Sequence, residues 1–128
     1  MSRDTILVVD DSRLLQMSMD LILKPYKKKG MSVEFASDGN QALERMVRDD
    51  TIGLVLLDLN MPSMSGWEFL AESRKKKLLE HIPVIIVSVE GDEGQRKRGI
   101  EEGAAAFLTK PFEFDALHKE ISAALGQE

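Results

Sequence analysis

The sequence has 128 residues, 43% of them hydrophobic, and its 22 acidic and 17 basic side chains give a formal net charge of −5. One domain with a single core is expected at this length, and the acidic balance argues against direct binding to nucleic acid or to an anionic membrane. The absence of cysteine excludes disulfides and thiolate chemistry, and no apolar run suits a membrane span or a signal peptide, so we expect a cytoplasmic protein.

Five segments have the pattern of buried strands, and they lie at residues 6–9, 32–36, 54–57, 84–87 and 104–108. Short apolar runs rich in β-branched residues are typical of strands covered on both faces, as in parallel sheets. In the second segment Val33 and Phe35 alternate with polar residues, which indicates a strand at the edge of the sheet.

Segments with the apolar spacing of helices follow the strands. The first is expected to end or kink just before Pro25, which cannot continue a regular helix. Its helical period is marked by Leu14, Met17 or Ser18, Leu21 and Ile22, and we expect this stripe to face the core. Asp38 and Ser65 are suitable N-caps for the second and third helices. With two further helices near 91–102 and 112–125, the alternation predicts an α/β fold with a parallel sheet.

Charged or hydroxyl side chains stand at the carboxyl ends of four predicted strands, namely Asp10, Asp11, Asp58, Ser88 and Lys110. In doubly wound sheets the binding site forms beyond these ends, so we expect the five residues to gather at one edge. Three carboxylates at about 4 Å repel one another by about 4 kcal/mol per pair at an effective dielectric constant near 20, so the cluster needs a cation or a proton. Oxygen ligands without histidine or cysteine favour magnesium.

Each of these residues also has an ordinary structural explanation when taken singly. Asp10 or Asp11 can cap the following helix, and Asp58 precedes a proline-containing loop where turn residues are common. Lys110 can be a solvated surface lysine, and Ser88 can bond the backbone at a strand end. Their occurrence together at the ends of four strands favours one shared site.

Several segments resemble the receiver domain of response regulators in two-component signalling, and the resemblance covers the whole chain. They are Val8–Ser12, Leu56–Gly66, Ile85–Ser88, Gly103–Ala104 and Lys110–Phe112. The pattern D-x-x-M-P-x-M-x-G within the second segment is highly specific. The resemblance implies a flavodoxin-like (βα)5 fold with strand order 2-1-3-4-5, and a single receiver domain over residues 1–128 with no effector domain.

The resemblance also implies a role for each site residue. Asp58 would accept the phosphoryl group, and Lys110 would pair with Asp58 at rest and with the phosphoryl group afterwards. Mg²⁺, for which Mn²⁺ can substitute, would be held by Asp11, Asp58 and the main-chain carbonyl of Asn60, with Asp10 acting through water. Such a protein catalyses only its own phosphorylation and dephosphorylation.

Further positions match the switch and the tuning sites of the family. Ser88 and Phe107 would form the switch, and Pro111 would follow a cis peptide bond. Asn60 and Glu90 would tune the rate of dephosphorylation. The implied phosphodonor is a phosphohistidine on a histidine kinase or a histidine phosphotransfer protein. The output surface would be the fourth helix, fifth strand and fifth helix, facing a downstream protein that the sequence does not name.

Other functions fit the sequence less well. Haloacid-dehalogenase phosphatases need a second aspartate where this chain has Asn60, and no P-loop motif is present. The alternative that stays open is a receiver-like interaction module that signals without phosphorylation, although every site residue is retained. The basic run Arg96–Arg98 falls on the expected output face, and we interpret it as a candidate docking patch for a partner.

Overall fold

The chain alternates between strands and helices along its length. The computed structural model describes residues 3–89 and 91–126, and these form five strands and six helices. The elements in chain order are β1 (Thr5–Val9), α1 (Arg13–Ile22), α2 (Lys24–Lys28), β2 (Ser32–Ala36), α3 (Gly39–Arg48), β3 (Ile52–Leu57), α4 (Gly66–Lys75), β4 (Val84–Ser88), α5 (Glu93–Glu101), β5 (Ala106–Thr109) and α6 (Phe114–Ala124).

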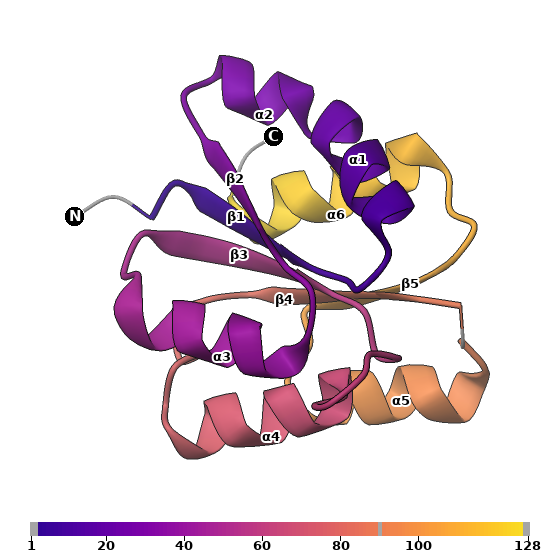
Figure 1. Ribbon diagram of the computed structural model, residues 1–128. Coiled ribbons are helices and arrows are strands. Elements are labelled where there is room, and N and C mark those ends of the chain that lie inside the picture. Colours follow the sequence, from indigo (N-terminus) through magenta and orange to yellow (C-terminus); the bar gives the residue numbers. More distant parts are fainter. Residues whose placement is uncertain (1–2, 90, 127–128) are drawn as a thin grey trace.

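The five strands form one parallel sheet with the order β2-β1-β3-β4-β5. Helices α1, α2 and α6 cover one face of this sheet, and α3, α4 and α5 cover the other (Figure 1). The predicted α/β class and the implied flavodoxin-like strand order are both confirmed. Because all strands run in the same direction, their carboxyl ends share one edge of the sheet.

The sheet separates two hydrophobic clusters. Strands β1, β3 and β4 are buried along their whole length, as their continuous apolar runs predict. Side chains alternate between the two faces of a strand, so Leu7 and Val9 of β1 join the cluster beneath α3, α4 and α5, whereas Ile6 and Val8 join the other. This burial makes the central strands a rigid support for the residues that follow them.

The first helical segment is divided in two. Helix α1 ends at Ile22, and the short helix α2 follows with Pro25 in its first turn, where the missing N–H of proline has no helical partner to lose. The predicted break is therefore confirmed, and the chain continues beyond it as a helix anchored by the buried Tyr26. Among the described residues, no helix is both long and apolar enough to cross a membrane.

The predicted inward face of α1 is wrong for Leu14, Met17 and Leu21, whereas Ile22 packs against the core as expected. Leu14 and Leu21 are 75% and 72% exposed, and Met17 is exposed as well. The helix instead buries Met19, and Leu23 is buried at its C-cap, four positions further along the same face. Helix α1 therefore presents apolar side chains to the core and to the surface, and apolar spacing alone could not decide which set is buried.

Candidate functional site

Two neighbouring strands place Asp10 and Asp58 side by side. Val9 and Leu57 are partners at the ends of β1 and β3, so the next residue of each strand reaches the carboxyl edge of the sheet. The main chain holds both positions, since the Asp58 N–H donates to the Val9 carbonyl at 2.9 Å and the Asp10 N–H donates to the Ala36 carbonyl at 3.0 Å. The backbone ladder thus extends one residue beyond the strands.

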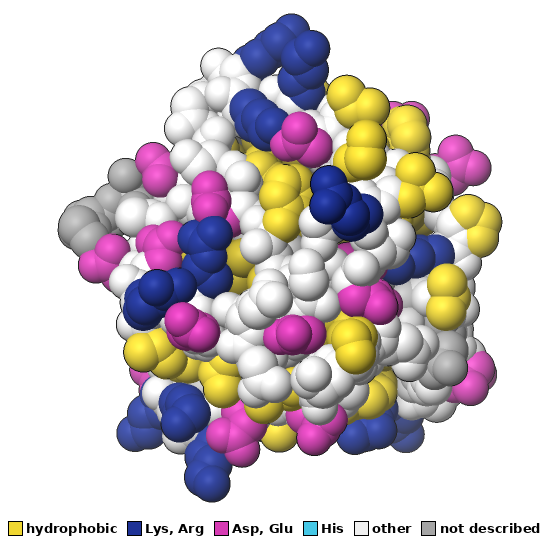
Figure 2. Space-filling model, in the orientation of Figure 1, with side chains coloured by type: hydrophobic (Ala, Val, Ile, Leu, Met, Phe, Trp, Pro, Cys, Tyr) yellow, Lys and Arg dark blue, Asp and Glu magenta, His cyan; other side chains and the backbone are white. Residues whose placement is uncertain are grey.

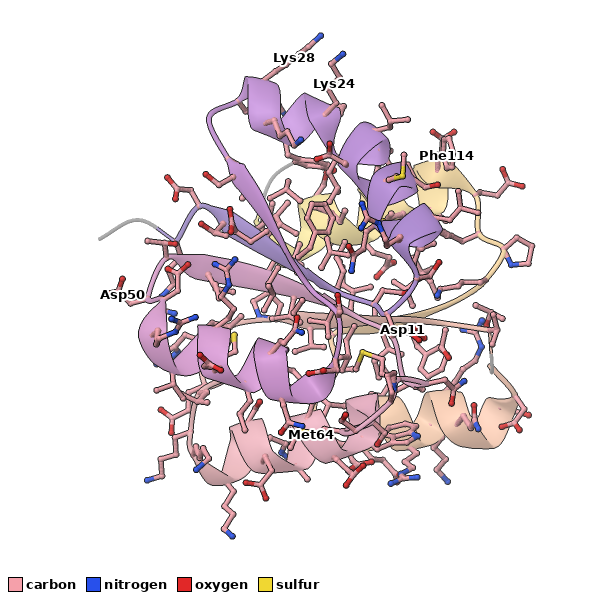
Figure 3. The ribbon with its side chains drawn as sticks, in the orientation of Figure 1. Asp11, Lys24, Lys28, Asp50, Met64 and Phe114 are labelled. Carbon is pink, nitrogen blue, oxygen red and sulfur yellow. The ribbon has the colours of Figure 1, made fainter. Side chains whose placement is uncertain are left out.

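Asp10, Asp11 and Asp58 form a compact group of carboxylates at this edge. One oxygen from each lies within 4.8 Å of the others. Asp10 is 2% and Asp58 is 6% exposed, whereas Asp11 is exposed, at the point where the chain leaves β1 for α1 (Figure 3). Three hard oxygen donors with one open side suit Mg²⁺, which keeps several water ligands. The residues present therefore fit the ion that the sequence predicted.

Lys110 supplies a positive charge beside the buried carboxylates. Its Nζ lies 2.8 Å from Oδ2 of Asp10 and 3.8 Å from Oδ1 of Asp58, and its side chain is 18% exposed. The expected resting pair with Asp58 is thus the longer of two contacts, and the shorter is with Asp10. The Lys110 N–H donates to the Ser88 carbonyl at 2.8 Å, which joins the ends of β4 and β5. The Lys110–Pro111 peptide bond is cis.

The ionised form of Asp58 is unfavourable in this setting. The pKa of Asp58 is raised to about 6, chiefly by burial and also by the charges of Asp10 and Asp11, against the opposing effects of Lys110 and a hydrogen bond from the Asn60 backbone. A cation at the carboxylates would favour the ionised form by offsetting the repulsion. The site therefore combines a buried acceptor oxygen with a strong preference for added positive charge.

Of the four remaining predicted residues, three lie in the part of the chain that the structure describes. Ser88 is fully buried as the last residue of β4, beside Thr109 in the sheet register. Asn60 is exposed in the loop that follows Asp58. Phe107 lies three residues before Lys110 and is buried in the core. Glu90 lies outside the described residues.

Sequence reasoning missed two residues that fix the positions of the carboxylates. The Ser12 N–H donates to Oδ1 of Asp10 at 2.8 Å, and the Ser12 hydroxyl caps α1 by accepting from the Leu15 N–H. At Gly66 a Cβ atom would lie 2.4 Å from the carbonyl oxygen of Asp58, so α4 can begin this close to the site only with glycine. Both residues lie inside the segments that resemble the family, but their roles depend on contacts that spacing does not reveal.

Comparison with known proteins places this geometry in a family. Residues 6–122 match the response regulator receiver domain. The chain is 38% identical over 120 residues to the transcriptional regulatory protein CpxR of Escherichia coli (strain K12), covering 94% of this chain and 48% of CpxR. It is 31% identical over 122 residues to the transcriptional regulatory protein HprR of the same organism, covering 95% of this chain and 52% of HprR. The chain spans about half the length of these relatives.

Solved structures agree with this assignment. The signal receiver domain of a putative LuxO repressor protein from Vibrio parahaemolyticus superposes with a TM-score of 0.87 at 27% identity, covering 97% of this chain and 91% of that one. The chemotaxis protein CheY4 of Vibrio cholerae gives a TM-score of 0.82 at 28% identity, covering 96% of this chain and 99% of that one. From the match over residues 6–122, the chain belongs to the response regulator receiver domain family of two-component signalling.

Proposed function

We propose that the chain accepts a phosphoryl group on Asp58 from a phosphohistidine of a histidine kinase or a histidine phosphotransfer protein. The observation that carries the proposal is the grouping of the buried Asp58 with Asp10, Asp11 and Lys110. A phosphoryl group brings negative charge to an already acidic place, so transfer requires positive charge on its oxygens. Lys110 and a bound Mg²⁺ meet this requirement.

The transfer exchanges one bond to phosphorus for another. A carboxylate oxygen of Asp58 forms the new P–O bond while the bond between phosphorus and the imidazole nitrogen breaks, and that nitrogen keeps the electron pair and takes a proton from solvent. When the phosphoryl group brings its negative charge to Asp58, the ammonium group of Lys110 turns from the carboxylates toward a phosphoryl oxygen. The hydrogen bond from the Asp58 N–H to the Val9 carbonyl fixes the backbone that carries the acceptor side chain.

The metal would be held by the residues that the sequence singled out. Asp11, Asp58 and the main-chain carbonyl of Asn60 are its proposed ligands, with Asp10 acting through water, and Mn²⁺ can replace Mg²⁺. When bound, the ion supplies charge neutralisation at the phosphoryl oxygens. The short contact between Lys110 and Asp10 supports an indirect role for Asp10, because its carboxylate already has a cationic partner.

Water ends the signal by attacking phosphorus, which breaks the bond to Asp58 and releases inorganic phosphate. Asn60 is exposed two residues beyond Asp58, where its amide can influence how that water approaches. Glu90 is the second position that we propose to tune this step, on the basis of the sequence alone. Hydrolysis requires no protein partner, so the chain acts on itself rather than on a separate substrate.

The signal is proposed to reach a downstream protein through α5, β5 and α6. Ser88 would bond a phosphoryl oxygen, and β5 with Phe107 would adjust to the movement. Phe107 is 6% exposed and packs in the core. In the proposed switch, Ser88 moves to bond the phosphoryl oxygen and Phe107 fills the space that it leaves.

The exposed apolar face of α1 is a proposed docking site for the phosphodonor protein. Leu14, Met17 and Leu21 line this face, and Phe114 lies beside it at the start of α6 (Figures 2 and 3). Contiguous exposed apolar patches are typical of protein–protein interaction sites. Helix α1 begins two residues after Asp11, so a donor seated on it would bring its phosphohistidine close to Asp58.

The proposal is tested with the purified chain and a small phosphodonor. Acetyl phosphate with Mg²⁺ is expected to add one phosphoryl group, seen by intact mass spectrometry. Asp58→Asn should abolish the addition, and Asp50→Asn, a change to an exposed acidic residue away from the site, serves as the matched control. Unchanged labelling of Asp58→Asn would disprove the acceptor, and no labelling of the wild type would favour an interaction module that works without phosphorylation.

A further inference from the structure

Arg96 of α5 makes an unusual set of contacts for a residue on an exposed helix. Its Nε donates to the Gly91 carbonyl at 3.1 Å, and its Nη1 donates to the Phe107 carbonyl at 3.1 Å. Its Nη2 donates to the Thr109 hydroxyl at 2.7 Å. The guanidinium carbon also lies 5.5 Å from the centre of the Phe107 ring, within the range of a cation–π interaction.

These contacts join two segments that both lead to the phosphoryl site. Gly91 belongs to the connection between β4 and α5, whereas Phe107 and Thr109 belong to β5. Thr109 pairs with Ser88 in the sheet and directly precedes Lys110. One side chain therefore joins Gly91, three residues after Ser88, to the strand that directly precedes Lys110.

Close packing at two glycines independently shows that this region has little spare room. A Cβ atom at Gly91 would lie 2.0 Å from the Thr109 hydroxyl oxygen, so the β4–α5 connection rests directly on β5. A Cβ atom at Gly99 would lie 3.0 Å from a ring carbon of Phe107. Phe107 is thus enclosed by α5 beneath and by Arg96 alongside.

Arg98 and Lys97, the other members of the basic run, do not share the contacts of Arg96. Arg98 pairs with Glu102 at 2.7 Å, and its guanidinium carbon lies 4.1 Å from the centre of the Trp67 ring on α4. Lys97 is exposed. Two of the three cations therefore bind groups of the chain itself, which weakens the interpretation of Arg96–Arg98 as a docking patch.

We propose that Arg96 is a positioning residue for phosphorylation, an inference that rests on the function proposed above. Its planar fork donates to three acceptors from three separate nitrogen atoms, whereas a lysine ammonium donates all of its hydrogen bonds from a single nitrogen. By fixing β5 and the β4–α5 connection together, it holds Ser88 and Lys110 in the arrangement that receives the phosphoryl group. Loss of the fork leaves both site residues present but frees the segments that carry them.

The test compares Arg96→Ala and Arg96→Lys with Lys97→Ala, which removes a neighbouring positive charge on the same helix. The first readout is amide hydrogen exchange of Phe107–Lys110 without metal or phosphoryl analogue. The second is the affinity for beryllofluoride with Mg²⁺, titrated by NMR or by Trp67 fluorescence. We expect faster exchange and about tenfold weaker beryllofluoride binding in both Arg96 variants, and wild-type behaviour in Lys97→Ala.

Each outcome decides a separate point. Arg96→Lys with wild-type exchange and affinity would overturn the proposal, because charge alone would then suffice. Equal effects of Arg96→Ala and Lys97→Ala would overturn it as well. A purely structural role lowers thermal stability without changing the affinity of the folded protein, and that result also counts against positioning. If the wild type fails to bind beryllofluoride, the proposed function fails, while the exchange experiment still shows whether Arg96 holds the two segments together.

Discussion

Because Asp58 is buried, its ionisation should change the free energy of unfolding of the metal-free protein. Its pKa is raised from 3.8 to about 6, so between these values the folded state binds a proton that the unfolded chain does not. The free energy of unfolding should therefore rise as the pH falls from about 7 toward 4, by at most about 3 kcal/mol.

Urea unfolding in the presence of a chelator measures this dependence. Asp58→Asn removes the titrating group and should flatten this part of the profile, so that the variant is the more stable protein above about pH 6. The sign follows from the raised pKa, because ionisation costs more in the folded state. Parallel pH profiles for the two proteins would contradict it.

Glycine at position 66 is a steric requirement of the site. A Cβ atom there would approach the Asp58 carbonyl oxygen to 2.4 Å, and both groups are backbone that cannot easily move. Gly66→Ala should destabilise the protein by about 1–3 kcal/mol and slow phosphorylation by displacing Asp58. Gly94→Ala is the matched control, because the nearest atom to its Cβ would be a side-chain oxygen at 3.4 Å.

The control should behave in the opposite way. Gly94 lies within α5, where alanine favours the helix by about 0.5–1 kcal/mol. Chemical denaturation and the rate of labelling by acetyl phosphate measure both variants. Equal stability of the Gly66 and Gly94 variants would show that α4 adjusts to the added methyl group.

At the scale of the elements, a change on α1 should distinguish phosphorylation by a donor protein from phosphorylation by acetyl phosphate. Leu14→Asp changes a side chain that is 75% exposed, so the free energy of unfolding should change by less than about 0.5 kcal/mol. If a donor protein docks on α1, transfer from a histidine phosphotransfer protein should slow by about tenfold, because the charge enters an apolar contact. Phosphorylation by acetyl phosphate should keep its wild-type rate.

Val47→Asp provides the control for this experiment. Val47 is an apolar residue of α3, 62% exposed, and α3 covers the opposite face of the sheet (Figure 1). This variant should retain wild-type rates with both donors. Slowing by Val47→Asp to the same extent would place the docking surface elsewhere, and slowing of acetyl phosphate by Leu14→Asp would indicate damage to the site itself.

The elements differ in how well the sequence predicted them. Strands β1, β3 and β4 were predictable because both of their faces are buried, which leaves an uninterrupted apolar run. The N-caps Asp38 and Ser65 were predictable because a short polar side chain before a helix has a specific hydrogen-bonding role. The buried face of α1 was not, since apolar residues occupy more than one side of that helix and only the packing of α6 and the sheet selects among them.

At the scale of the whole molecule, how much of the site could be predicted depended on the arrangement of the sheet. Three carboxylates and a lysine at strand ends follow from the chain order once the sheet is parallel, but the strand order was implied by the resemblance to a family. The closer approach of Lys110 to Asp10 than to Asp58, and the bonds from Arg96 to β5, depend on side-chain positions across long sequence separations. Such contacts leave no signal in the spacing of residues.

Metal binding should act on the stability of the whole molecule, because the site exists only when β1 and β3 lie together. Residues 10, 11 and 58 converge only in the folded sheet, so we expect Mg²⁺ to bind the folded state in preference to the unfolded chain. At a concentration about ten times its dissociation constant, it should add about 1.4 kcal/mol to the free energy of unfolding. Differential scanning calorimetry at increasing Mg²⁺ measures the effect as a rise in melting temperature.

Asp11, the exposed member of the proposed ligand set, provides the control for this experiment. Asp11→Asn keeps the buried pair of carboxylates and the contact of Lys110 with Asp10, so the metal-free fold should be preserved. It removes one charge from the proposed ligand set, which should abolish most of the rise in melting temperature. A rise of the same size in both proteins would mean that Mg²⁺ binds elsewhere, and no rise in the wild type at millimolar metal would remove the ion from the proposed mechanism.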